Sequence, residues 1–224
     1  SYWQTTEYKT DANRSTIWNP QGGYDAPRSF DGEIMNQLHD QKARYYDGSG
    51  GGWAPLSMFG PDRAATAAGR IEMGYNQGKK DAKTIIDNLA RDPSNNIIET
   101  IKIVTHSMGG AYGNGFVKAL KEYIKTLPIE QQKQIKITLV ADFDPFQAGG
   151  ITADPDIKTN QIKHDNPWNI FGMGWLANED EKGATQIPPD KNEDSDHSIF
   201  TFFNDISKLA EGTYKWDGFK FVKQ

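Results

Sequence analysis

The chain has 224 residues, of which 36% are hydrophobic and 12% aromatic, and it contains no cysteine. This length and composition fit a single domain, residues 1–224, and the lack of cysteine excludes disulfides, thiolate catalysis and cysteine-ligated zinc. The formal net charge is -5, so the composition does not indicate a positively charged surface for phosphate groups. We therefore do not expect nucleic acid as a partner.

Nothing in the sequence indicates a membrane anchor or a leader. No stretch approaches the roughly 18 consecutive apolar residues of a membrane-spanning helix, and residues 1–18 lack the basic start and apolar run of a signal peptide. The chain begins at Ser1 without a methionine, which suits a mature secreted protein or a module excised from a longer one. The sequence does not define the cellular compartment, and we favour a secreted or extracellular location.

The first half of the chain carries short apolar runs and one long amphipathic pattern. The expected elements are a strand at 16–18, a helix that contains Phe30, Ile34 and Leu38, a strand at 44–46, a glycine-rich turn at 47–52, and a long helix at 63–89.

In the second half, runs rich in Ile and Val alternate with helical spacing. The expected elements are a strand at 101–104, a helix at 109–127, strands at 135–140 and 161–163, a last helix at 198–209, and a hairpin at 214–221. Strands that alternate with helices predict an α/β fold, with a mainly parallel central sheet and helices on both faces. The loops at 149–160 and 178–196 are long for a compact domain, and such loops are usually functional or disordered.

The most informative segment is 103–110, Ile-Val-Thr-His-Ser-Met-Gly-Gly, where an apolar strand breaks at Ser107 and a helix follows. This pattern is typical of a nucleophile elbow, a strained turn that holds a serine at the carboxyl edge of a sheet and needs small residues two positions away. Gly109 meets that need, and the β-branched Thr105 departs from it. The alternative is that Ser107 is an ordinary helix N-cap, which leaves the glycines at the helix start unexplained, since glycine costs about 1 kcal/mol relative to alanine there.

An elbow predicts an oxyanion hole. One donor is the backbone N–H of the residue after the nucleophile, which is Met108. The second donor should follow an earlier strand, and we assign it to Gly22 in the loop 21–23. The glycines at 50–52 compete for this role, and both glycine sets can also be plain turns.

In an α/β hydrolase the chain order is nucleophile, acid, base, which assigns the base to His197, before the last helix. The alternative is a surface histidine in an acidic loop. Asp142, Asp144 and Asp165 are candidates for the acid. We prefer Asp165, because in the usual layout the acid follows the second strand after the nucleophile.

These residues resemble lipase-like α/β hydrolases, including bacterial lipase-like modules at the ends of large secreted proteins, over about 44–209. The elbow is similar to that of lipases and esterases, 143–149 resembles a strand end of class 3 lipases, and 165–168 resembles their acid turn. The resemblance implies an α/β-hydrolase fold and a lipase or esterase that cleaves esters of apolar acids through an acyl-enzyme, without cofactor or metal. Another acyl hydrolase (a phospholipase, thioesterase or toxin-like effector module) and a non-catalytic binding module remain alternatives.

Between the expected acid and base lies an aromatic segment, 168–176. Its Trp168, Phe171 and Trp175 suit the apolar wall of a substrate groove, and the segment could form a lid that contacts lipid surfaces transiently. Plain core packing is the alternative. The acidic run at 190–196 is interpreted as a solvated loop, with calcium binding as the rival interpretation.

Overall fold

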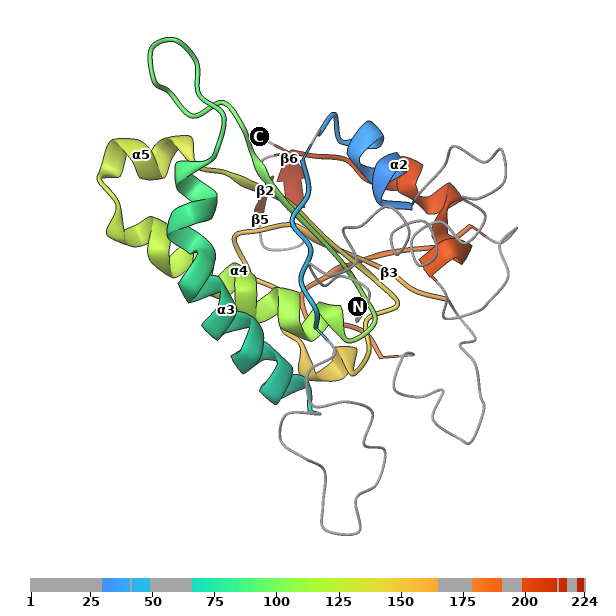
Figure 1. The fold of residues 1–224 in the computed structure, drawn as a ribbon. Coiled ribbons are helices and arrows are strands. Elements are labelled where there is room, and N and C mark those ends of the chain that lie inside the picture. The colour runs from blue at the N-terminus through green and yellow to red at the C-terminus, as the bar shows by residue number, and fades with distance from the viewer. Residues whose placement is uncertain are drawn as a thin grey trace.

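The computed structural model describes residues 30–40, 42–48, 66–164, 179–190, 199–212, 214–216 and 221–223. Its elements in chain order are α2 (Phe30–Gln37), α3 (Ala67–Asp87), β1 (Ile101–His106), α4 (Gly109–Thr126), α5 (Ile129–Gln134), β2 (Ile137–Phe143), η4 (Ala148–Gly150), β3 (Thr159–Ile162), β4 (Thr185–Ile187), η6 (Ile199–Phe202), η7 (Asn204–Lys208), β5 (Tyr214–Trp216) and β6 (Phe221–Lys223) (Figure 1).

The centre of the described structure is a four-stranded sheet in the order β1-β2-β3-β4, in which every neighbouring pair is parallel. Thr105 of β1 pairs with Asp142 of β2, which in turn pairs with Gln161 of β3. Parallel neighbours need a crossover, and α4 provides the first one, between β1 and β2. The molecule is therefore an α/β protein with a parallel sheet, which confirms the predicted α/β class.

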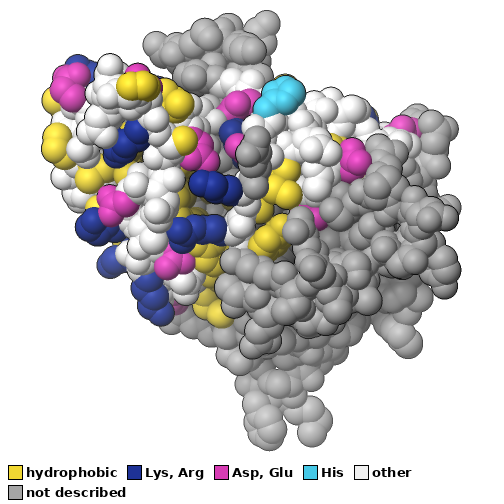
Figure 2. Space-filling model, turned by 45° about the horizontal axis from the view of Figure 1, so that its top comes forward, with side chains coloured by type: hydrophobic (Ala, Val, Ile, Leu, Met, Phe, Trp, Pro, Cys, Tyr) yellow, Lys and Arg dark blue, Asp and Glu magenta, His cyan; other side chains and the backbone are white. Residues whose placement is uncertain are grey.

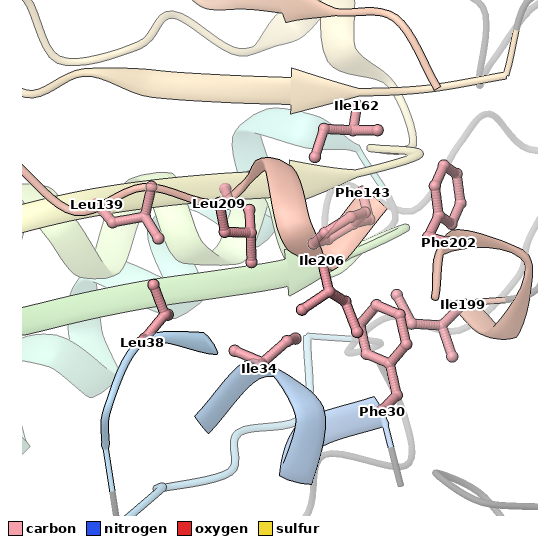
Figure 3. Packing of buried hydrophobic residues seen from close by; sticks show 11 residues of the cluster. Phe30, Ile34, Leu38, Leu139, Phe143, Ile162, Ile199, Phe202, Ile206 and Leu209 are labelled. Carbon is pink, nitrogen blue, oxygen red and sulfur yellow. The ribbon is translucent and has the colours of Figure 1, made fainter. Parts of the chain in front are cut away.

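Helices cover both faces of this sheet (Figure 1). On one face, α4 packs Val117 against Val140 of β2, and α3 lies against α4. On the other face, α2, η6 and η7 build the largest cluster over β2 and β3. Figure 3 shows Phe30 of α2 and Phe202 of η6 converging on Phe143 at the end of β2, with ring centroids 5.5 and 5.3 Å from that of Phe143. Burial of side chains of this size contributes roughly 1.5–3 kcal/mol each, which anchors the end of β2.

The helices α3 and α4 cross at close range, and glycines make this possible. A Cβ on Gly74 or on Gly115 would lie 1.9 Å from a backbone oxygen of the other helix, that of Tyr112 or of Ile71. Helix α3 begins at a capped end, where the Thr66 hydroxyl accepts the Gly69 N–H at 3.1 Å. The close crossing fixes α4, and therefore the residues at its N-terminus, relative to the rest of the layer.

Most predicted elements are present, with shifted ends. The helices expected around Phe30, at 63–89 and at 109–127 are α2, α3 and α4, and the hairpin is β5 and β6. Strands β1 and β2 continue further toward their carboxyl ends than predicted, and β3 begins earlier. Strand β4 lies inside the loop predicted at 178–196, and the strand predicted at 44–46 is absent. The strand predicted at 16–18 lies outside the described residues.

The helix predicted at 198–209 is present only in part, because the chain forms the two 3-10 helices η6 and η7 and not one continuous helix. Asp205 is fully buried and accepts the Asp190 backbone N–H at 2.9 Å, while Lys208 Nζ lies 2.5 Å from the same carboxylate oxygen. In a 3-10 helix, side chains three apart share one edge. This repeat places Lys208 on the same edge of η7 as Asp205, whose carboxylate it contacts.

Candidate active site

Ser107 occupies the turn between β1 and α4, and its backbone is in the left-handed region with φ 55°. This conformation is uncommon outside glycine and costs about 1–3 kcal/mol, so it persists only where the surroundings hold it. The Ser107 N–H donates to the Phe143 oxygen at 3.0 Å, and the Ser107 oxygen accepts the Gly110 and Phe146 N–H groups, each at 3.0 Å. Met108, and not Ser107, occupies the N-cap position of α4, so the N-cap interpretation of Ser107 does not hold.

The elbow pattern calls for a small residue at position 105, and a glycine in α4 makes room for the larger Thr105 that stands there. A Cβ on Gly113 would lie 2.6 Å from Thr105 Cγ2, so this glycine makes the space that the threonine methyl fills. Similarly, a Cβ on Gly110 would lie 2.9 Å from Cβ of Pro145, in the loop after β2. Close packing around the turn therefore explains Gly110 and Gly113.

The N-terminus of α4 begins directly after Ser107, at Met108. Within the described residues, the Met108 backbone N–H has no hydrogen-bond acceptor, and the N-terminus of a helix favours negative charge. Gly48 lies against this end of α4, since a Cβ on it would be 2.9 Å from the Cα of Gly109. The start of the glycine-rich turn at 47–52 is thus next to the elbow, while Gly22 lies outside the described residues.

Asp144 and His164 lie at the same edge of the sheet as Ser107. The backbone bond from the Asp144 N–H to the Ile162 oxygen, 2.8 Å, continues the ladder between β2 and β3 just beyond the strands. Asp144 has a positive φ of 41°. Its carboxylate accepts the His164 backbone N–H at 3.0 Å and lies 3.1 Å from His164 Nδ1.

Asp142 is placed differently from Asp144. Its side chain is buried between the sheet and α4, where it accepts a hydrogen bond from the Thr105 hydroxyl and faces Glu181. Burial raises the pKa of both carboxyls, and the proximity of Asp142 raises that of Glu181 further. Two buried like charges disfavour each other, so the pair retains a proton at neutral pH. Asp142 is therefore turned to the interior of the sheet and not to its carboxyl edge.

Arg70 is a residue near the elbow that the sequence analysis missed. It is 1% exposed, its guanidinium donates to Gln147 Oε1 at 2.9 Å, and it lies 5.6 Å from the ring centre of Phe146. Burial lowers its pKa. Arg70 therefore fixes the loop after β2, in which the Phe146 N–H donates to the Ser107 oxygen. The one sequence signal for this role was the presence of an arginine within the apolar pattern of 63–89.

The other predicted site residues lie outside the described residues. These are the acid Asp165, the base His197, the donor Gly22, and the groove residues Trp168, Phe171 and Trp175. Their assignments stay predictions. Asp165 immediately follows the described His164, and His197 precedes η6 by two residues.

In the described ranges, no three His, Asp or Glu residues cluster so as to hold a metal ion. Basic and acidic side chains are interspersed on the described part of the face in Figure 2. Among the helices of the described residues, none is long and apolar enough to cross a membrane.

Comparisons with family models, with curated proteins and with solved structures give no match to this chain. The class that the fold itself defines is that of α/β proteins with a parallel sheet, in which a strained serine, a helix N-terminus and a buried Asp-His pair share the carboxyl edge. In such sheets, ligands bind outside the carboxyl ends of the strands.

Proposed function

We propose that this protein is a serine hydrolase that cleaves carboxylic esters of apolar acids, with Ser107 as its nucleophile. The observation that carries the proposal is the left-handed backbone of Ser107, held by three backbone hydrogen bonds between a parallel strand and a helix. Strain of this kind is retained at functional sites, and an N-cap serine has no need of it.

In the proposed reaction, the Ser107 hydroxyl attacks the acyl carbonyl while the base takes its proton. Met108 N–H stabilises the negative oxygen that develops, a role for which a backbone donor at a helix N-terminus is suited. The intermediate then expels the alcohol, which receives the proton from the base, and water hydrolyses the acyl-enzyme. His197 is the proposed base, and the α/β-hydrolase fold is the proposed superfamily.

For the second oxyanion donor, we favour the glycine-rich turn at 47–52 over Gly22. The contact between Gly48 and Gly109 supports this choice, because it brings the chain entering that turn to the end of α4. The aromatic segment 168–176, with Trp168, Phe171 and Trp175, remains the proposed wall of the acyl groove. Phospholipase, thioesterase and effector-type activities use the same acyl-transfer chemistry, so they stand as substrate alternatives within this proposal.

The proposal is tested with p-nitrophenyl esters of increasing acyl length. The wild-type protein is expected to release p-nitrophenol with saturation kinetics, with kcat/KM rising with chain length. Ser107→Ala should reduce turnover to background while the melting temperature changes little, because the hydroxyl is the attacking group. Ser94→Ala is the matched control, since Ser94 is an exposed serine in a turn, and it should retain full activity. Turnover by Ser107→Ala equal to that of wild type would exclude the mechanism.

A further inference from the structure

The pair formed by Asp144 and His164 is built from buried groups. Asp144 is fully buried and His164 is 3% exposed. Both oxygens of the Asp144 carboxylate meet His164, one through the backbone N–H at 3.0 Å and the other through Nδ1 at 3.1 Å. A carboxylate that accepts two such bonds is held in one orientation. Within the described residues, His164 Nε2 has no partner, so the ring makes its hydrogen bond through Nδ1 alone.

The strand order determines what this histidine can act on. Strand β2, which leads into Asp144, lies between β1, which leads into Ser107, and β3, which leads to His164. Neighbouring strands lie about 4.8 Å apart, so His164 is about two spacings from the strand that carries the nucleophile and one from the strand that carries the carboxylate. With Nδ1 directed at Asp144, His164 is placed to orient that carboxylate and not to take the serine proton.

The chain that follows the proposed base returns to this pair. Only one residue, Ser198, separates His197 from η6, where the Phe202 ring lies 4.2 Å from the His164 ring and 5.3 Å from that of Phe143, measured between centroids. Phe143 directly precedes Asp144, so η6 covers the strand end that carries the carboxylate. This packing brings the segment after His197 to Asp144.

We propose that Asp144 is the acid of the site and that His164 is a positioning residue that holds its carboxylate. The inference rests on the proposed function and assigns to Asp144 the role for which the sequence favoured Asp165. The Asp144 carboxylate would hold the base in the tautomer that accepts the Ser107 proton and stabilise the imidazolium that forms, without being protonated itself. The Nδ1–H of His164 would keep the carboxylate in that geometry.

The test is the second-order rate constant of labelling by a fluorophosphonate from pH 5 to 9, with the adduct located by peptide mass spectrometry. Asp144→Asn is expected to slow labelling of Ser107 by about 10³- to 10⁴-fold, and Asp165→Asn by less than about tenfold. The pH midpoint of the residual labelling by Asp144→Asn should lie below that of wild type, because a base without a negative neighbour is protonated less readily.

Two substitutions separate orientation from simple stability. His164→Phe keeps a ring against Phe202 and should slow labelling by about 10²-fold, the effect of a misplaced catalytic group. His164→Asn places an amide donor near the position of Nδ1 and should restore the rate to within about threefold of wild type. His39→Asn is the matched control, since His39 is exposed with a φ of 56° that asparagine tolerates, and it should label at the wild-type rate.

The outcomes distinguish this inference from the proposed function. Labelling of wild type with a collapse in Asp165→Asn and a normal rate in Asp144→Asn overturns the inference and leaves the serine mechanism standing. No labelling of wild type removes both. A lower melting temperature of His164→Phe with the wild-type labelling rate would reduce the pair to a structural contact between β2 and β3. If Asp144→Asn does not fold, the two His164 variants test the inference. Slow labelling of His164→Phe with a near wild-type rate for His164→Asn supports it, and equal rates for the two variants overturn it.

Discussion

Gly113→Ala is expected to change the free energy of unfolding with a sign that depends on residue 105. The added methyl would lie 2.6 Å from Thr105 Cγ2, too close for two carbon atoms. Overpacking of this kind costs about 1–3 kcal/mol, whereas replacing glycine by alanine within a helix gains about 1 kcal/mol. The net effect in wild type is therefore a loss of up to about 2 kcal/mol. In a chain of this size, that corresponds to a melting temperature lower by about 4–8 °C.

Thr105→Ser removes the opposing methyl and keeps the hydroxyl that donates to Asp142. In that background, Gly113→Ala should stabilise the protein by up to about 1 kcal/mol, so the double-mutant cycle should give a coupling of about 1–3 kcal/mol. Urea unfolding of the four proteins at one pH measures all the terms. An equal destabilisation by Gly113→Ala in both backgrounds would refute the idea that this glycine makes room for the threonine in the strand before the elbow.

Two further predictions concern charge and metal. The pKa values of Asp142 and Glu181 are raised in the folded state by burial, so the folded state holds more protons above about pH 4, and the free energy of unfolding should fall as pH rises. Glu181→Gln should make that fall shallower by up to about 1.4 kcal/mol per pH unit in urea titrations from pH 5 to 9, and an unchanged slope would contradict the shared proton. Chelation with EDTA should leave ester hydrolysis unchanged, because side chains carry out the proton and acyl transfers; activity lost and restored by calcium would assign a cation to the acidic run at 190–196.

The elements with strong local signals were predictable from the sequence. The Ile-Val run before Ser107 and the apolar spacing of 109–127 gave β1 and α4 with the correct turn between them. Strand β4 was not predictable in the same way, because its burial is partial and its Thr-Gln-Ile sequence has no hydrophobic alternation. In the last helix the apolar spacing suited an α-helix, whereas the chain forms two 3-10 helices with Asp205 fully buried in the second.

The site was predictable where chemistry coincides with a local pattern. Ser107 stood out because its turn imposes glycines nearby, and Met108 followed from its position. The contacts that cross the sheet, such as those between Asp144 and His164 or Arg70 and Gln147, join residues that no spacing relates. Such contacts depend on strand order and register, which come from tertiary packing. The sequence placed His164 at the end of a strand, which was its only signal. Because the acid was chosen by chain order, His164 was not assigned a role.

The proposed function depends on Ser107 being an activated nucleophile. The most direct measurement is the intact mass of the folded protein after exposure to excess fluorophosphonate, followed by peptide mapping. We expect one adduct per chain, located on Ser107, that is absent from Ser107→Ala and from protein unfolded in urea before exposure, because the activation depends on the folded site. An unmodified folded protein, or an adduct carried by another residue while Ser107 is intact, would contradict it.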